Sequence, residues 1–209
     1  MTKMRRIAAG AALLTAAASP VLAQPVNFTT TGRFTSARPA CNNVSALMNA
    51  TCSFDGFNLV FNGTSAVNIG SNTVASLGSF LLTGIDGNTT IPSGTVTFEL
   101  FISQTTPSIG NTSFMGSVMG SVTIGVGGNV SSLVWLPTSQ SRAIGNTRYE
   151  LIYDNIGPAA NRGFAVPVNN LRGISTTVIT NVVPEPSTVV LLGTGFAVLF
   201  GMALRRKNV

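Results

Sequence analysis

Five carboxylates are the groups in the central part of the chain that could support catalysis. They are Asp55, Asp86, Glu99, Glu150 and Asp154. The chain has no histidine, and its lysines stand only near the two ends, so the common Ser-His and Ser-Lys nucleophile pairs cannot form in this part. Glycoside hydrolysis needs only two carboxyl groups facing a cleft, which leaves a glycan hydrolase to be considered.

The sequence around these carboxylates argues against a hydrolase. Asp55 and Asp86 each precede a glycine, in turns where the side chain serves the local backbone. Glu150 follows Arg148 by two residues on one strand face, which predicts a surface pair. Glu99 stands on the threonine-rich face of a strand, where we expect it to be solvated or paired with an arginine. The sequence therefore predicts no catalytic residue and no enzyme.

Metal and cofactor sites are not indicated either. Cys41 and Cys52 have no histidine and no second cysteine pair with which to complete a zinc site. The turn Asp86-Gly87-Asn88 offers one certain charged ligand, which is few for calcium. We expect no metal and no cofactor.

Carbohydrate binding is the alternative function that the sequence leaves open. Sandwich modules that bind sugars usually stack them on exposed aromatic side chains, and Trp135 is the single tryptophan. Its apolar neighbours Leu133, Val134 and Leu136 favour a position in the core or at a strand end. If the domain does bind a carbohydrate, the expected ligand is an exopolysaccharide.

The elements that must position these residues are strands. In residues 95–103, Val96, Phe98, Leu100 and Ile102 alternate with polar residues, which predicts a half-buried strand. Residues 116–127 alternate in the same way around Gly120, which predicts a long strand that is bent or bulged at that glycine.

Further strands are expected wherever apolar and polar residues alternate between turn residues. They fall at 58–62, 67–69, 79–83, 130–136, 147–153, 164–168 and 174–182. Turns are expected at Asp55-Gly56, Pro92-Ser93-Gly94 and similar pairs, and the one candidate helical turn lies at residues 44–50. Many short strands indicate an all-β fold, an antiparallel, jelly-roll-like β-sandwich of about eight to ten strands.

Charge separates the ends of the chain from its centre. The chain carries a net charge of +6, but residues 24–183 hold six arginines against five carboxylates, which leaves +1. Nucleic-acid binding needs clustered Lys and Arg, so it is excluded for the central region.

The N-terminus has the three parts of a secretory signal peptide. Basic residues precede the apolar run 7–18, and small residues follow up to Ala23. We predict cleavage between Ala23 and Gln24, and therefore export.

The C-terminus adds a second apolar segment. Residues 188–204 contain no charge and, as a helix, would span roughly 26 Å, which reaches across the hydrocarbon core of a bilayer. Arg205, Arg206 and Lys207 follow and would stay cytoplasmic. The sequence predicts a transmembrane helix with the domain outside the membrane.

Directly before this segment lie Val183, Pro184, Glu185, Pro186 and Ser187. Proline fixes its own backbone angle and extends the preceding residue, so Pro-Glu-Pro is a stiff, extended segment that a protease could bind. Together with the apolar span and the basic tail, it resembles the PEP-CTERM sorting signal of exported bacterial proteins. The resemblance covers about the last 27 residues and implies recognition, and cleavage, by an exosortase-type membrane protease.

Export also decides how the cysteines are read. Disulfides persist outside the cytoplasm, so we predict a bond between Cys41 and Cys52.

The sequence thus predicts a signal peptide (1–23), a β-sandwich domain (24–182) and a PEP-CTERM sorting signal (183–209). The expected protein is exported, held as an inner-membrane-anchored precursor, and then displayed at the cell surface or released. The hosts of such sorting systems secrete exopolysaccharide, so the resemblance implies a structural protein of an envelope, biofilm or extracellular matrix.

Overall fold

The computed structural model describes residues 24–37, 41, 43–84, 87–124, 133–155, 162–181, 193, 195 and 196. The predicted signal peptide lies outside these residues, and so does the predicted tail except for Gly193, Gly195 and Phe196, which are helical. Every strand among the described residues belongs to one compact unit, residues 23–181.

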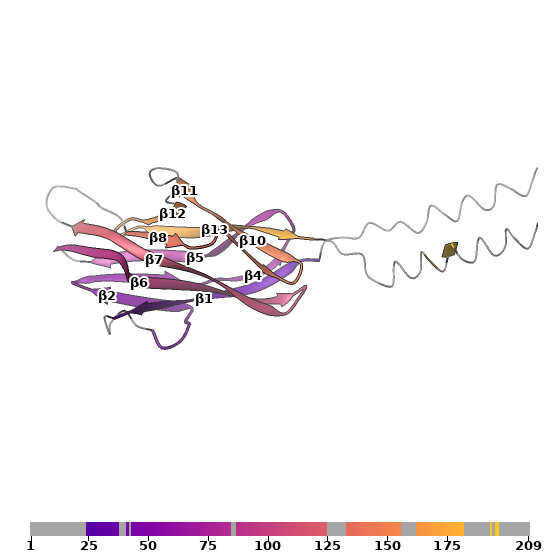
Figure 1. The fold of residues 1–209 in the computed structure, drawn as a ribbon, viewed down its shortest axis with the longest axis horizontal. Helices are drawn as coiled ribbons and strands as arrows, with labels where there is room; N and C mark the ends of the chain where they lie inside the picture. Colours follow the sequence, from indigo (N-terminus) through magenta and orange to yellow (C-terminus); the bar gives the residue numbers. More distant parts are fainter. Residues whose placement is uncertain are drawn as a thin grey trace, which may run out of the picture. The chain divides into compact units, whose positions relative to one another are not determined.

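The described elements of this unit are antiparallel strands in two sheets (Figure 1). A seven-stranded sheet has the order β11-β12-β8-β7-β6-β1-β4, and a six-stranded sheet has the order β2-β3-β5-β13-β10-β9. The strands of the first sheet are β1 (Val26–Ser36), β4 (Ser65–Ile69), β6 (Gly87–Thr106), β7 (Gly110–Ile124), β8 (Leu133–Pro137), β11 (Asp154–Asn155) and β12 (Arg162–Val166). Those of the second are β2 (Asn49–Phe54), β3 (Phe57–Asn62), β5 (Thr73–Gly84), β9 (Ser141–Ile144), β10 (Thr147–Ile152) and β13 (Leu171–Thr180).

Aromatic side chains from both sheets meet in the core. Phe34 and Phe98 of the seven-stranded sheet contact Phe80 of the six-stranded sheet, with ring centroids 6.5 and 4.8 Å apart. Phe61 of the six-stranded sheet lies 4.9 Å from Phe98. Such edge-to-face and tilted pairs add to the stabilisation from burial. The predicted two-sheet antiparallel fold is confirmed, whereas its jelly-roll-like connection stays a prediction.

The alternating pattern located most strands but not β1. The inward positions of β1 include Thr30 and Gly32, which hide the apolar period. Thr30 is fully buried, and its hydroxyl is satisfied there because Oγ1 donates to the Leu77 carbonyl at 2.8 Å. A Cβ on Gly32 would lie 2.5 Å from the Phe61 ring and 2.6 Å from the Phe98 ring, so only glycine fits there. Strands β2, β9 and β11 were also not predicted.

The expected turn at Pro92-Ser93-Gly94 is wrong, because these residues lie inside the single strand β6. The register between β6 and β7 shifts there, from the pair Ile91–Gly120 to the pair Val96–Val118. Four residues of β6 thus face one of β7. The irregularity predicted at Gly120 is confirmed, but the extra residues belong to the partner strand.

The expected helical turn at residues 44–50 is also wrong. Leu47 forms a β-bridge with Gly32, and β2 begins at Asn49. Backbone hydrogen bonds to β1 satisfy this segment in place of helical ones: Gly32 N and Leu47 N each donate to the other residue's carbonyl at 2.8 Å.

Candidate functional site

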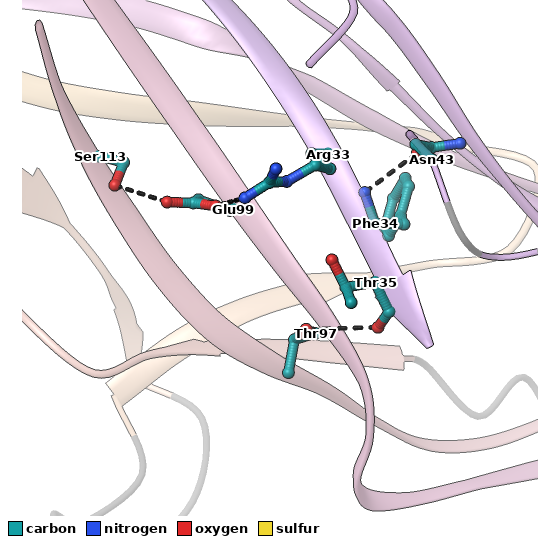
Figure 2. A network of polar contacts seen from close by, with 7 residues as sticks. All are labelled: Arg33, Phe34, Thr35, Asn43, Thr97, Glu99 and Ser113. Carbon is teal, nitrogen blue, oxygen red and sulfur yellow. Dashed lines mark hydrogen bonds and ion pairs between the residues drawn. The ribbon is translucent and has the colours of Figure 1, made fainter. Parts of the chain in front are cut away.

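A polar network lies on the outer face of the seven-stranded sheet, across the strands β1, β6 and β7 (Figure 2). Arg33 Nη2 of β1 lies 2.6 Å from Glu99 Oε2 of β6. Ser113 Oγ of β7 donates to Glu99 Oε1 at 2.8 Å. The Arg33 guanidinium also lies over the Phe101 ring, 5.3 Å from its centroid. Both oxygens of the carboxylate are therefore held, and three neighbouring strands are tied together.

The geometry of Glu99 matches the predicted arginine pair rather than a free acid. Two other described carboxylates are paired as well, Glu150 with Arg148 at 2.6 Å and Asp154 with Arg172. A glycosidase needs two carboxyl groups that face one substrate. Of the three ion pairs, Arg33–Glu99 and Arg172–Asp154 link different strands, and Arg148–Glu150 links two side chains of one strand.

Asn43 joins the two sheets next to this network, and Figure 2 shows its contact with Phe34 of β1. Its Oδ1 accepts from Phe34 N of β1 at 3.0 Å, and its Nδ2 donates to the Thr51 carbonyl of β2 at 3.1 Å. The predicted bond between Cys41 and Cys52 is present beside it. The Asn43 side chain thus occupies one backbone carbonyl of β2, which is an edge strand of the six-stranded sheet.

Arg142 lies on β9, the other edge strand of the six-stranded sheet, and contacts β7. Its Nε donates to the Ser113 carbonyl of β7 at 2.7 Å, and its Nη1 donates to Ser139 Oγ at 2.8 Å. Thr138 N donates to the next outward carbonyl of β7, that of Met115, at 2.9 Å. Two outward carbonyls of β7 are capped in this way, beyond the end of its pairing with β8.

Trp135 lies in the core, as its neighbours predict. Its side chain is fully buried, and its ring lies 5.3 Å from that of Phe98 and 5.5 Å from that of Phe164. A buried ring cannot stack on a sugar, so the carbohydrate-binding role considered for Trp135 is wrong.

Metal-ligating side chains do not gather in the described part of the chain, where no three of them come together. Asp86, the charged residue of the turn considered for calcium, lies outside that part, while Gly87 and Asn88 belong to β6.

The junction with the C-terminal tail is fixed at the end of β13. Thr180 N donates to Ser71 Oγ at 3.0 Å, and Asn181 N donates to the Asn146 carbonyl at 3.0 Å. The predicted sorting residues, Val183 to Ser187, and the basic residues, Arg205 to Lys207, begin just beyond and lie outside the described residues. Gln24, which follows the predicted signal cleavage, is exposed, whereas Ala23 is not described. None of the described helical residues forms a helix with the length and hydropathy to span a membrane.

The strands define a disulfide-bonded β-sandwich that passes directly into its C-terminal tail. Residues 182–207 of that tail match the family model described as the PEP-CTERM protein-sorting motif. The chain therefore carries this motif. The motif indicates export, processing by an exosortase (a membrane enzyme) and membrane-linked sorting to the surface. No curated protein and no solved structure gives a significant match.

Sequence reasoning did not find Arg33, Asn43, Ser113 or Arg142 as structural contacts. A strand pattern gives the face on which a residue lies but not the register that places Arg33 opposite Glu99.

Proposed function

We propose that this protein is a structural component of the bacterial cell surface or extracellular matrix, exported and released from the membrane by an exosortase-type protease. The observation that carries the proposal is the PEP-CTERM motif at residues 182–207, directly after the last strand. In the precursor, residues 188–204 form the membrane anchor and Arg205 to Lys207 hold its cytoplasmic end.

The described domain supports a structural role. Its disulfide suits an oxidising compartment, and Asn43, Thr138 and Arg142 occupy backbone carbonyls of β2 and β7 that could otherwise accept bonds from other chains. Such a domain persists outside the cell as a discrete unit. We further propose that it has no catalytic function: Glu99→Gln and Glu150→Gln should leave glycan turnover by the purified protein unchanged, and a loss in either variant would support a hydrolase.

The test of sorting is the intact mass of the protein recovered from the surface and medium of the producing bacterium, with both ends mapped. A species that starts at Gln24 and ends near Pro184 is expected. A species that still ends at Val209 would show a permanent membrane anchor and contradict release into a matrix.

Direct binding of exopolysaccharide is the second candidate, and the outer face of the seven-stranded sheet favours it. Thr31 and Ser113 stand opposite the half-buried Phe101 in the strand register, beside the Arg33–Glu99 pair. The Arg33 guanidinium lies over the Phe101 ring, so a sugar would bind through the hydroxyl and charged groups around the ring rather than by stacking on the covered face. Retention of the protein on its host's exopolysaccharide, weakened by Phe101→Ala, is expected from this candidate; no retention would rule it out.

A further inference from the structure

One end of the sandwich differs from the rest of its surface. This end, called the tail-bearing end, is where β13 finishes. Five segments meet there: residues 24–27, 68–73, 105–110, 144–147 and 180–181. All of them are described, and Figure 1 shows the two ends of the domain emerging there.

Hydrogen bonds hold the segments of the tail-bearing end in place. Asn72 N donates to the Val178 carbonyl at 2.7 Å, and Asn68 N donates to Asn27 Oδ1 at 2.6 Å. Thr106 Oγ1 donates to the Pro25 carbonyl at 3.2 Å. The end is therefore a preformed surface rather than a set of free loops.

The tail-bearing end has no charged side chain in any of its five segments. At its tip, Ile109 is 89% exposed. The nearest charged side chains along β10 are Arg148 and Glu150, which pair with each other at 2.6 Å. Ile109 is therefore the apolar side chain that a partner approaching this end would cover on contact.

Chain length brings the sorting motif close to this surface. Among the described residues of the sandwich, Asn181 is the last, and its N–H is held by the Asn146 carbonyl. An extended residue spans at most 3.3–3.6 Å, so Pro184 lies within roughly 11 Å of Asn181 and Pro186 within roughly 18 Å. A protease that binds the motif must therefore approach the folded domain at this end.

We propose that the exosortase-type protease docks on the tail-bearing end while it binds the sorting motif. The inference rests on the proposed function and adds a folded surface to the linear motif. Protein is favoured over lipid as the partner, because the end has no Lys or Arg to attract anionic headgroups and no Trp or Tyr to anchor at a membrane interface.

The test follows removal of the tail from the full-length chain in cells that contain the native protease. Ile109→Asp places a charge on the docking surface and should slow cleavage about fivefold or more. Val44→Asp is the matched control, since Val44 is 98% exposed but lies on the segment beside Cys41, and it should be cleaved at the wild-type rate. Wild-type cleavage of Ile109→Asp, or equal slowing of Val44→Asp, would overturn docking. If the wild-type chain itself is not cleaved, the proposed function fails instead.

A photoreactive residue at position 109 identifies the partner. Crosslinking to the protease is expected from position 109 and not from position 44. Lipid adducts without protease adducts would overturn the proposal in favour of a membrane contact. Insertion of about ten Gly and Ser residues after Asn181 should remove the requirement for docking, so that Ile109→Asp no longer slows cleavage in the extended chain.

Discussion

Arg33 and Glu99 stand directly opposite each other on β1 and β6, with Nη2 and Oε2 2.6 Å apart. Arg148 and Glu150 form a pair of the same length, but along one strand. The Glu99 side chain is 13% exposed and that of Glu150 is 38% exposed. Two chemically identical pairs thus differ in burial and in the number of strands that they join.

Glu99→Gln should therefore lower the free energy of unfolding by about 1 kcal/mol, because Arg33, which is less exposed than Arg148, loses its counter-charge. Glu150→Gln should change it by less than about 0.5 kcal/mol, since solvent screens the exposed pair. Urea unfolding of both variants measures the difference. Equal effects would mean that the cross-strand pair contributes no more than a surface pair.

Gly32 should not tolerate a larger residue. In Gly32→Ala the new methyl group would overlap the packed rings of Phe61 and Phe98, so we expect a loss of about 2 kcal/mol or more. Gly173→Ala is the control, because no atom lies within 4 Å of its added Cβ, and its stability should stay within about 0.5 kcal/mol of wild type. Thermal unfolding compares them. A wild-type melting temperature for Gly32→Ala would show that this core can rearrange.

The bond between Cys41 and Cys52 should stabilise the domain by closing a short loop in the unfolded chain. The two cysteines are 11 positions apart in the sequence, and the chain-entropy model gives about 3 kcal/mol for a loop of this size. The double variant Cys41→Ser/Cys52→Ser should lose about that much in urea unfolding. A reductant should destabilise the wild type and leave the double variant unchanged. If the reductant leaves the stability of the wild type unchanged while the double variant is less stable, the effect of the mutations lies in packing and not in the bond.

Burial raises the pKa of the Tyr149 hydroxyl, which donates to Gln104 Oε1 at 2.6 Å. Because the folded state keeps this proton more strongly than the unfolded state, its stabilising effect is complete below the unfolded pKa of about 10 and is lost as the pH rises beyond it. The free energy of unfolding should therefore fall above about pH 10.

Tyr149→Phe should lessen that alkaline loss, whereas the control Tyr153→Phe should keep it. Unfolding curves from pH 8 to pH 11 test this, together with phenolate absorbance of the folded protein. Ionisation of Tyr149 at the ordinary pH in the folded state would contradict the expected shift.

The sequence alone determined the class of the fold and the sorting motif. Both are local in the chain: alternation in residues 95–103 depends only on neighbours, and the sorting motif is a run of adjacent residues within 182–207. The disulfide also followed from the sequence, since two cysteines in an exported chain have one pairing.

The tertiary structure decided everything that depends on register and packing between the sheets. Thr30 and Gly32 look polar and small in the sequence, yet they face the core because Leu77 supplies an acceptor and two phenylalanine rings supply the missing volume. The contacts of Glu99 also depend on the tertiary structure, because its partners lie 66 residues before it and 14 residues after it. No local pattern encodes such pairs, because long-range strand pairing is set by the summed burial of both sheets rather than by any one segment.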